Sequence, residues 1–78
     1  MLNEKTLKDL AEGESALIKK VCNTDHMRRR LFDLGFAPES MVSCALTAPL
    51  GDPKAYVIKG TVIALREEDS SLILVKSL

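Results

Sequence analysis

Residues 27–40 read MRRRLFDLGFAPES, a pattern that predicts one short helix with a sharp end. At about 100° per residue, Met27, Leu31 and Leu34 lie on one narrow apolar face of this helix. Gly35 ends it, because glycine reaches without penalty the left-handed conformation that commonly follows the last helical turn. We therefore expect the helix to pack on the rest of the chain with Leu31 and Leu34 buried.

Local patterns also indicate where the helix starts and what surrounds it. Asn23, Thr24 and Asp25 can each cap the first turn, and the sequence leaves the choice open. Residues 6–10 contain two leucines spaced as one helical turn. Turn residues fill 49–53, which predicts a surface hairpin loop. Apolar patterns predict short strands at 14–22, 41–48, 54–59, 61–65 and 72–75.

These elements together predict a mainly β protein. We expect a strongly bent sheet or small barrel of about five strands, with one short α-helix between the first two strands. Closing the sheet removes exposed strand edges, which otherwise invite pairing between molecules. The length of 78 residues predicts a single domain over 1–78, because a chain of this size has only just enough core to fold.

The charge balance and the N-terminus indicate a cytoplasmic protein. The 11 basic and 11 acidic residues give a formal net charge of zero, so we expect no general attraction to nucleic acid or to an anionic membrane. No apolar run approaches the roughly 18 to 20 residues that cross a bilayer. The first residues, MLNEKTLK, lack the apolar core of a secretion signal and the acid-free, Arg-rich character of a transit peptide.

The chain has few residues suited to catalysis or metal binding. His26 follows Cys22 by four residues, but a cysteine at a strand end and a histidine at a helix start have no assured geometry as a catalytic dyad. Cys22, His26 and Cys44 also lack the spacing of zinc ligands, and a structural zinc site needs four. We expect reduced cysteines packed on strands, with no catalytic residue, no bound metal and no cofactor.

Residues for binding a partner are found on the helix and on the hairpin loop. Arg28, Arg29 and Arg30 fan around the helix, so a solvated face is the alternative to partner recognition. Arg30 borders the apolar face, which leaves Arg28 and Arg29 as contact candidates. Leu50, at the loop tip, either folds back over the sheet edge or makes an exposed contact, and both interpretations stay open. Asp52, in the same loop, is the fourth candidate.

Several blocks of the chain, taken in order, resemble the FeoA family of small cytosolic proteins of bacterial ferrous iron transport. RLFDLGFAPES at 30–40 is similar to the Arg-Leu-x-x-Leu-Gly signature of the family and the proline turn that follows it. The likeness continues through APLGDP at 48–53, KGTVIALR at 59–66 and ILV at 73–75. Glu39 departs from the pattern, because the family usually has glycine directly after the proline. We expect the turn there to differ in detail.

The resemblance implies an SH3-like small β-barrel without enzymatic activity. It also implies an accessory or regulatory role in which the protein binds FeoB, the membrane transporter of ferrous iron with a cytosolic GTP-binding domain. Similar domains occur at the C-terminal end of iron-dependent transcription repressors. The alternative is therefore a regulator-like module that binds a transition metal or another regulator domain. The zero net charge and the lack of a separate DNA-reading helix favour the transporter accessory.

Overall fold

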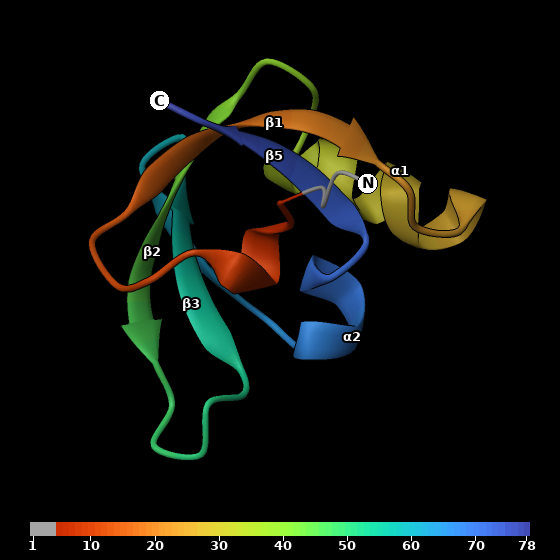
Figure 1. Cartoon of the computed structure of the whole chain (residues 1–78). Helices are drawn as coiled ribbons and strands as arrows, with labels where there is room; N and C mark the ends of the chain where they lie inside the picture. Colours follow the sequence, from red (N-terminus) through yellow and green to blue (C-terminus); the bar gives the residue numbers. More distant parts are fainter. Residues whose placement is uncertain (1–4) are drawn as a thin grey trace.

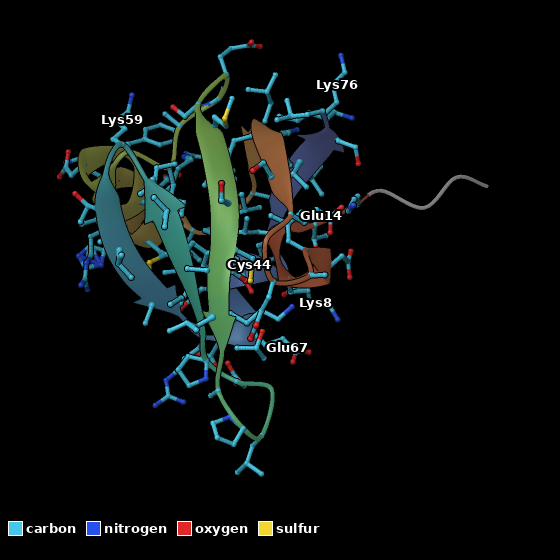
Figure 2. The ribbon with its side chains drawn as sticks, turned by 90° about the vertical axis from the view of Figure 1, so that its left-hand side faces the viewer. Lys8, Glu14, Cys44, Lys59, Glu67 and Lys76 are labelled. Atoms are coloured by element: carbon cyan, nitrogen blue, oxygen red, sulfur yellow. The ribbon has the colours of Figure 1, made fainter. Side chains whose placement is uncertain are left out.

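Residues 5–78 of the computed structural model are described here, and they form a five-stranded antiparallel sheet that curls around one core (Figure 1). The strands are ordered β4-β3-β2-β1-β5 across the sheet, so β4 lies at one edge of the sheet (Figure 2). In chain order, the elements are η1 (Leu7–Asp9), β1 (Ser15–Val21), α1 (Asp25–Leu34), β2 (Met41–Thr47), β3 (Lys54–Ile58), β4 (Thr61–Leu65), α2 (Glu67–Ser70) and β5 (Ile73–Ser77).

The strands expected from the sequence are confirmed, with one shift of register in β2 that the alternation did not predict. Strict alternation along this strand would place Val42, Cys44 and Leu46 on one face, but Leu46 is 64% exposed while the other two are buried. Cys44 pairs with Tyr56, whereas Leu46 pairs with Ala55, so an extra residue lies between them in β2. Such a bulge reverses the phase of the side chains that follow it, and Leu46 therefore points outward.

A second register shift interrupts the alternation of buried and exposed side chains in β1. Ile18 pairs with Val75, and Lys20, two positions later, pairs with Leu74, which is next to Val75 in β5. The extra residue brings both Ile18 and Val21 into the core, although they are three positions apart. The bulge thus allows both residues to be buried while the two lysines between them are exposed.

The turn before β1 supplies an essential part of the core. Leu7, the first residue of the 3-10 turn η1, and Leu10, which follows its last residue, are fully buried among the sheet side chains. The hydroxyl of Tyr56, itself fully buried, donates a hydrogen bond of 3.3 Å to the carbonyl oxygen of Leu7. Burial raises the pKa of Tyr56, so the phenol stays protonated and keeps its role as donor.

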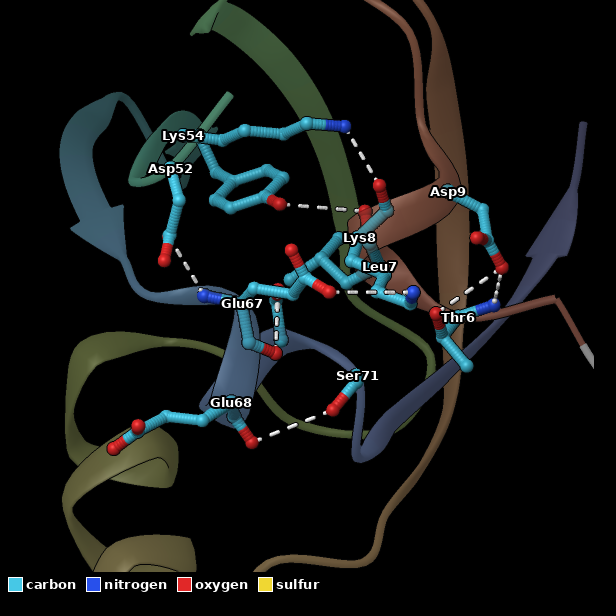
Figure 3. A network of polar contacts seen from close by, with 11 residues as sticks. Thr6, Leu7, Lys8, Asp9, Asp52, Lys54, Glu67, Glu68 and Ser71 are labelled. Carbon is cyan, nitrogen blue, oxygen red and sulfur yellow. Dashed lines mark hydrogen bonds and ion pairs between the residues drawn. The ribbon is translucent and has the colours of Figure 1, made fainter. Parts of the chain in front are cut away.

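A network of polar contacts fixes η1 against β3 and α2 (Figure 3). Lys54 Nζ donates hydrogen bonds of 2.6 and 2.8 Å to the backbone carbonyl oxygens of Lys8 and Leu10. Lys8 Nζ in turn lies 3.5 Å from the Glu67 carboxylate. The ammonium of Lys54 therefore satisfies carbonyl groups that the short turn cannot satisfy within itself.

The helix α1 has the ends that the sequence indicated. Thr24 takes the N-cap position, and Gly35 follows the last turn in the left-handed conformation with φ of 107°. The Phe36 amide then donates a 2.8 Å hydrogen bond to the Leu31 carbonyl oxygen, which closes the helix end.

The burial expected for α1 is confirmed for Leu31 and wrong for Leu34. Leu31 is fully buried, whereas Leu34 remains 42% exposed. The reason is that α1 contacts the core through Leu31, with Met27 only partly buried beside it. Leu34 instead faces a groove between α1 and β4.

The turn after α1 shows the effect of glutamate at the position where glycine was expected. Glu39 has φ of 76°, a left-handed conformation that costs a residue with a side chain roughly 1 to 2 kcal/mol and costs glycine nothing comparable. Its amide donates a 2.8 Å hydrogen bond to the Ile18 carbonyl oxygen. The backbone of this turn therefore has a conformation that glycine adopts most readily, and here it is held with a glutamate.

The ion pair between Lys5 and Glu14 is expected to make stability depend on pH. The hydrogen bond from the Lys5 side chain, together with one from the Ala11 amide, holds the pKa of Glu14 below its ordinary value of 4.5. Because the pKa of this carboxyl is lower in the folded than in the unfolded protein, its ionised form stabilises the fold at any pH above the unfolded-state pKa. This stabilisation is lost as the pH falls through the folded-state pKa. We expect Glu14→Gln to lower the urea midpoint at neutral pH, with the difference from wild type closing below pH 4.5. A difference that stays constant through acid pH would contradict this interpretation.

Candidate functional site

The four residues expected to contact a partner lie in two separate places. Arg28 and Arg29 are on α1, while Leu50 and Asp52 are in the loop between β2 and β3. Figure 1 shows this loop at one end of the molecule and α1 at another, and Figure 2 separates them in the same way. The structure therefore does not bring the four residues together as one site.

The two arginines belong to a shallow depression on the exposed side of α1. Arg28 forms an ion pair with Asp25, one turn earlier in the helix. Arg29 is exposed and has no ion pair among residues 5–78. With Phe32, which is 43% exposed, these side chains line a depression of about 330 Å³. This part of the surface combines an unpaired cation with an aromatic ring, a pair of groups that is frequent in protein interfaces.

The loop residues have different roles from one another. Leu50 is 95% exposed, so it does not fold back over the sheet edge, and its contact with a partner stays a prediction. Asp52 instead accepts a 2.8 Å hydrogen bond from the backbone amide of Glu67 at the start of α2, as drawn in Figure 3. Its carboxylate stabilises the fold by satisfying an amide that the helix leaves free.

We expect Asp52→Ala to lower the free energy of unfolding by about 0.5 to 2 kcal/mol, the usual cost of losing a side-chain acceptor at a helix start. Leu50→Ala is the matched control in the same loop, because a side chain that is 95% exposed changes stability by less than about 0.5 kcal/mol. Urea denaturation of both variants tests this. Equal stability of the two variants would show that the Asp52 carboxylate does not support α2.

A groove between α1 and β4 is the larger feature of this surface, with a volume of about 400 Å³. We call it the α1–β4 groove. Its apolar lining includes Met27 and Leu34 from the helix and Ile63 from the strand, and its polar lining consists of Arg30, Arg66 and Asp69. Sequence reasoning missed it, because the two walls are about thirty positions apart in the chain and Leu34 was expected to be buried.

The charges of the α1–β4 groove are only partly balanced. Neither Arg30 nor Arg66 has an ion pair within the part of the chain that the structure describes. Asp69 uses its backbone carbonyl oxygen to accept a 3.1 Å hydrogen bond from the Asn23 side chain. Two cations therefore face one carboxylate, and the rim has an excess of positive charge suited to an anionic group on a partner.

The residues considered for catalysis and metal binding are spread over the structure. Cys44 is buried in β2, as expected, but Cys22 is exposed, so the prediction that both cysteines are packed was wrong for Cys22. The bulge in β1 turns Val21 into the core, and Cys22 follows it outward. His26 is exposed in the first turn of α1. Among residues 5–78, no three His, Cys, Asp or Glu side chains gather as ligands for one metal ion.

The described part of the chain has no helix with the length and apolar character that a membrane crossing requires.

Comparisons with known proteins agree with the resemblance seen in the sequence. A model of the FeoA domain matches residues 5–77. The chain is 33% identical over 67 residues to a fusion of Fe(2+) transport protein A and the Fe(2+) transporter FeoB from Porphyromonas gingivalis. This match covers 86% of the chain but 8% of that protein, so the chain corresponds to a small part of the fusion.

Solved structures give the same result for the fold. The solution structure of FeoA from Chlorobium tepidum is 31% identical with a TM-score of 0.90, and the match covers 95% of this chain and 70% of that one. FeoA from Stenotrophomonas maltophilia, crystallised with zinc and described as an SH3 domain protein, is 29% identical with a TM-score of 0.82 over 92% of this chain and 89% of that one. The predicted SH3-like fold is confirmed, and the chain belongs to the FeoA domain family.

Proposed function

We propose that this protein is a cytoplasmic accessory protein of ferrous iron uptake that binds the cytosolic region of a FeoB-like transporter. The observation that carries the proposal is the relative in which a domain similar to this chain and FeoB form one polypeptide. Fusion of two domains in one organism supports association of the corresponding separate proteins in another organism. The linker of a fusion keeps the two domains at a high effective concentration, whereas separate proteins reach each other through binding affinity. The protein acts in this proposal by binding, without a reaction of its own.

The surface of α1 and the adjoining α1–β4 groove is the contact we propose. It offers exposed apolar side chains beside cations, whereas the domain as a whole is neutral. Arg28 and Arg29 form its outer part. Leu50, which is almost fully exposed on the distant loop, is a second and separate contact in this proposal, and Asp52 contributes by holding that loop to α2. A small interface of this kind is expected to give affinity in the micromolar range, or about −8 kcal/mol.

Charge reversal on α1 tests the proposed contact. We expect the double variant Arg28→Glu, Arg29→Glu to bind the transporter's cytosolic domain at least about tenfold more weakly, a loss of roughly 1.4 kcal/mol. Its melting temperature should stay close to that of wild type, because exposed charges contribute little to stability. Isothermal titration calorimetry and thermal melts of the same samples give both quantities.

The matched control is Lys76→Glu, which reverses an exposed charge on β5, away from α1 in Figure 2. It should bind as wild type does. Lys76→Glu changes the net charge by half as much as the double variant, so a loss of binding free energy about half that of the double variant would show that only the overall charge matters. Full affinity of the double variant would exclude the outer face of α1 as the contact.

A further inference from the structure

The strand β4 is at an open edge of the sheet. Its residues pair with β3 on one side only, from Ile58 with Thr61 to Lys54 with Leu65. The two strands are joined by Lys59 and Gly60, whose φ angles of 49° and 79° are both positive. Two positive φ angles in a two-residue loop define a type I′ hairpin, in which the residues that flank the loop exchange hydrogen bonds.

The hairpin fixes which backbone groups of β4 face outward. Because Thr61 is hydrogen-bonded to β3, so is Ile63 two positions later, and the intervening Val62 and Ala64 direct their amides and carbonyl oxygens to the free edge. Both side chains are exposed, with Val62 at 63%. Among the described residues, no loop or terminus forms a backbone hydrogen bond with these two positions. The edge therefore presents a row of unsatisfied donors and acceptors, the usual template for an added strand.

The α1–β4 groove lies directly beside this edge. Ile63, Ala64 and Leu65 line it from the strand, and Met27 and Leu34 line it from α1. An extended segment paired with β4 would place alternate side chains into the groove. These side chains need to be apolar, since the groove presents mainly apolar walls to them.

The charges of the rim indicate which other residues the segment carries. Arg30 borders the groove along α1, and Arg66 directly follows β4. Both guanidinium groups lack an ion pair among residues 5–78. Carboxylates on the added segment would give these cations their partners, while lysines would add to the excess positive charge.

We propose that β4 accepts an extended, acidic and apolar segment of a protein partner as an added strand, with its apolar side chains in the α1–β4 groove and its carboxylates on Arg30 and Arg66. This proposal rests on the proposed function, because it specifies how the transporter is bound. It differs from docking through side chains alone in one respect: the backbone of Val62 and Ala64 takes part.

A titration with synthetic peptides tests the strand addition without the transporter. The probe is a short peptide with threonine at every second position, and with two central valines flanked by two glutamates at the positions between, so that valines and glutamates share one face of the extended strand. Its control has lysine in place of both glutamates. With the glutamate peptide, we expect saturable NMR shifts at α1 and β4 and at least about tenfold slower hydrogen exchange of the Val62 and Ala64 amides at saturation. The lysine peptide should bind at least about tenfold more weakly. Absence of saturable shifts, or equal affinity for both peptides, would overturn the proposal.

Two further variants separate the backbone from the charges. Ala64→Pro removes the outward amide and is tolerated at an edge position, so it should reduce peptide affinity at least about tenfold. Ala64→Ser keeps the amide and should bind as wild type does. The charge reversal Arg30→Glu, Arg66→Glu should invert the preference between the two peptides, and this result does not depend on whether the proline variant folds. An unchanged preference would contradict the assigned role of the arginines.

The cytosolic domain of a FeoB-like transporter gives the last comparison. Slower exchange of the Val62 and Ala64 amides in its complex supports the added strand. Binding without this protection overturns the added strand and leaves the proposed function standing, whereas binding of the peptide but not of the transporter overturns the proposed function alone. Protection that rises with protein concentration in the absence of any partner would assign the edge to a second copy of the chain and overturn the proposal.

Discussion

Replacing Phe36 by alanine is expected to lower the free energy of unfolding by about 3 to 5 kcal/mol. Phe36 is fully buried and directly follows Gly35, so it anchors the end of α1 to the core. Its loss removes a large apolar surface and leaves a cavity that the neighbouring strands cannot close. A domain of this size has a total stability of roughly 4 to 12 kcal/mol, so this single change removes a large part of it. Urea denaturation followed by circular dichroism measures the difference.

Phe32→Ala is the matched control for this prediction. The ring of Phe32 is 43% exposed on the same helix, so its removal should cost about 1 kcal/mol or less. A cost for Phe36→Ala no larger than that for Phe32→Ala would show that the turn after α1 does not anchor the helix to the core.

Leu31→Ala is expected to cost roughly 2 to 5 kcal/mol for a related reason. Leu31 is the one residue of α1 that is fully buried, and its carbonyl oxygen also accepts the hydrogen bond that ends the helix. The mutation leaves this backbone bond in place, so the loss measures side-chain packing. It can be determined from the shift of the urea midpoint at an unchanged slope.

Leu34→Ala serves as the comparison within the same helix. With Leu34 42% exposed in the α1–β4 groove, the mutation should cost only about 1 kcal/mol. Equal losses at the two positions would mean that α1 packs through a wider face, as the sequence alone suggested.

The order of the elements could be predicted from the sequence, because each leaves a local signature. The spacing of Met27 and Leu31, with Gly35 after them, predicted α1, and the apolar alternation predicted the strands. The outward direction of Leu46 could not be predicted, because a bulge inserts one residue without a signal in the alternation. Burial of Leu34 could not be predicted either, since it depends on how closely α1 approaches β4.

The proposed contact surface was predicted only in part. Arg28 and Arg29 were singled out by charge, and the structure places them beside Phe32. Asp52 was chosen for its position in a loop, but its hydrogen bond to Glu67 joins residues 15 positions apart and has no sequence signature. The α1–β4 groove arises from packing between distant segments, and only the folded chain shows it.

The measurement that tests the account most directly is an NMR titration of the isotope-labelled protein with the cytosolic domain of a FeoB-like transporter. We predict saturable shifts with micromolar affinity, concentrated on α1 and β4, with smaller changes around Leu50. Lys76, away from α1 on β5 in Figure 2, should keep its signal. No shifts at saturating concentration, or shifts confined to β5 and β1, would contradict the claim that this protein binds the transporter through α1 and the groove beside it.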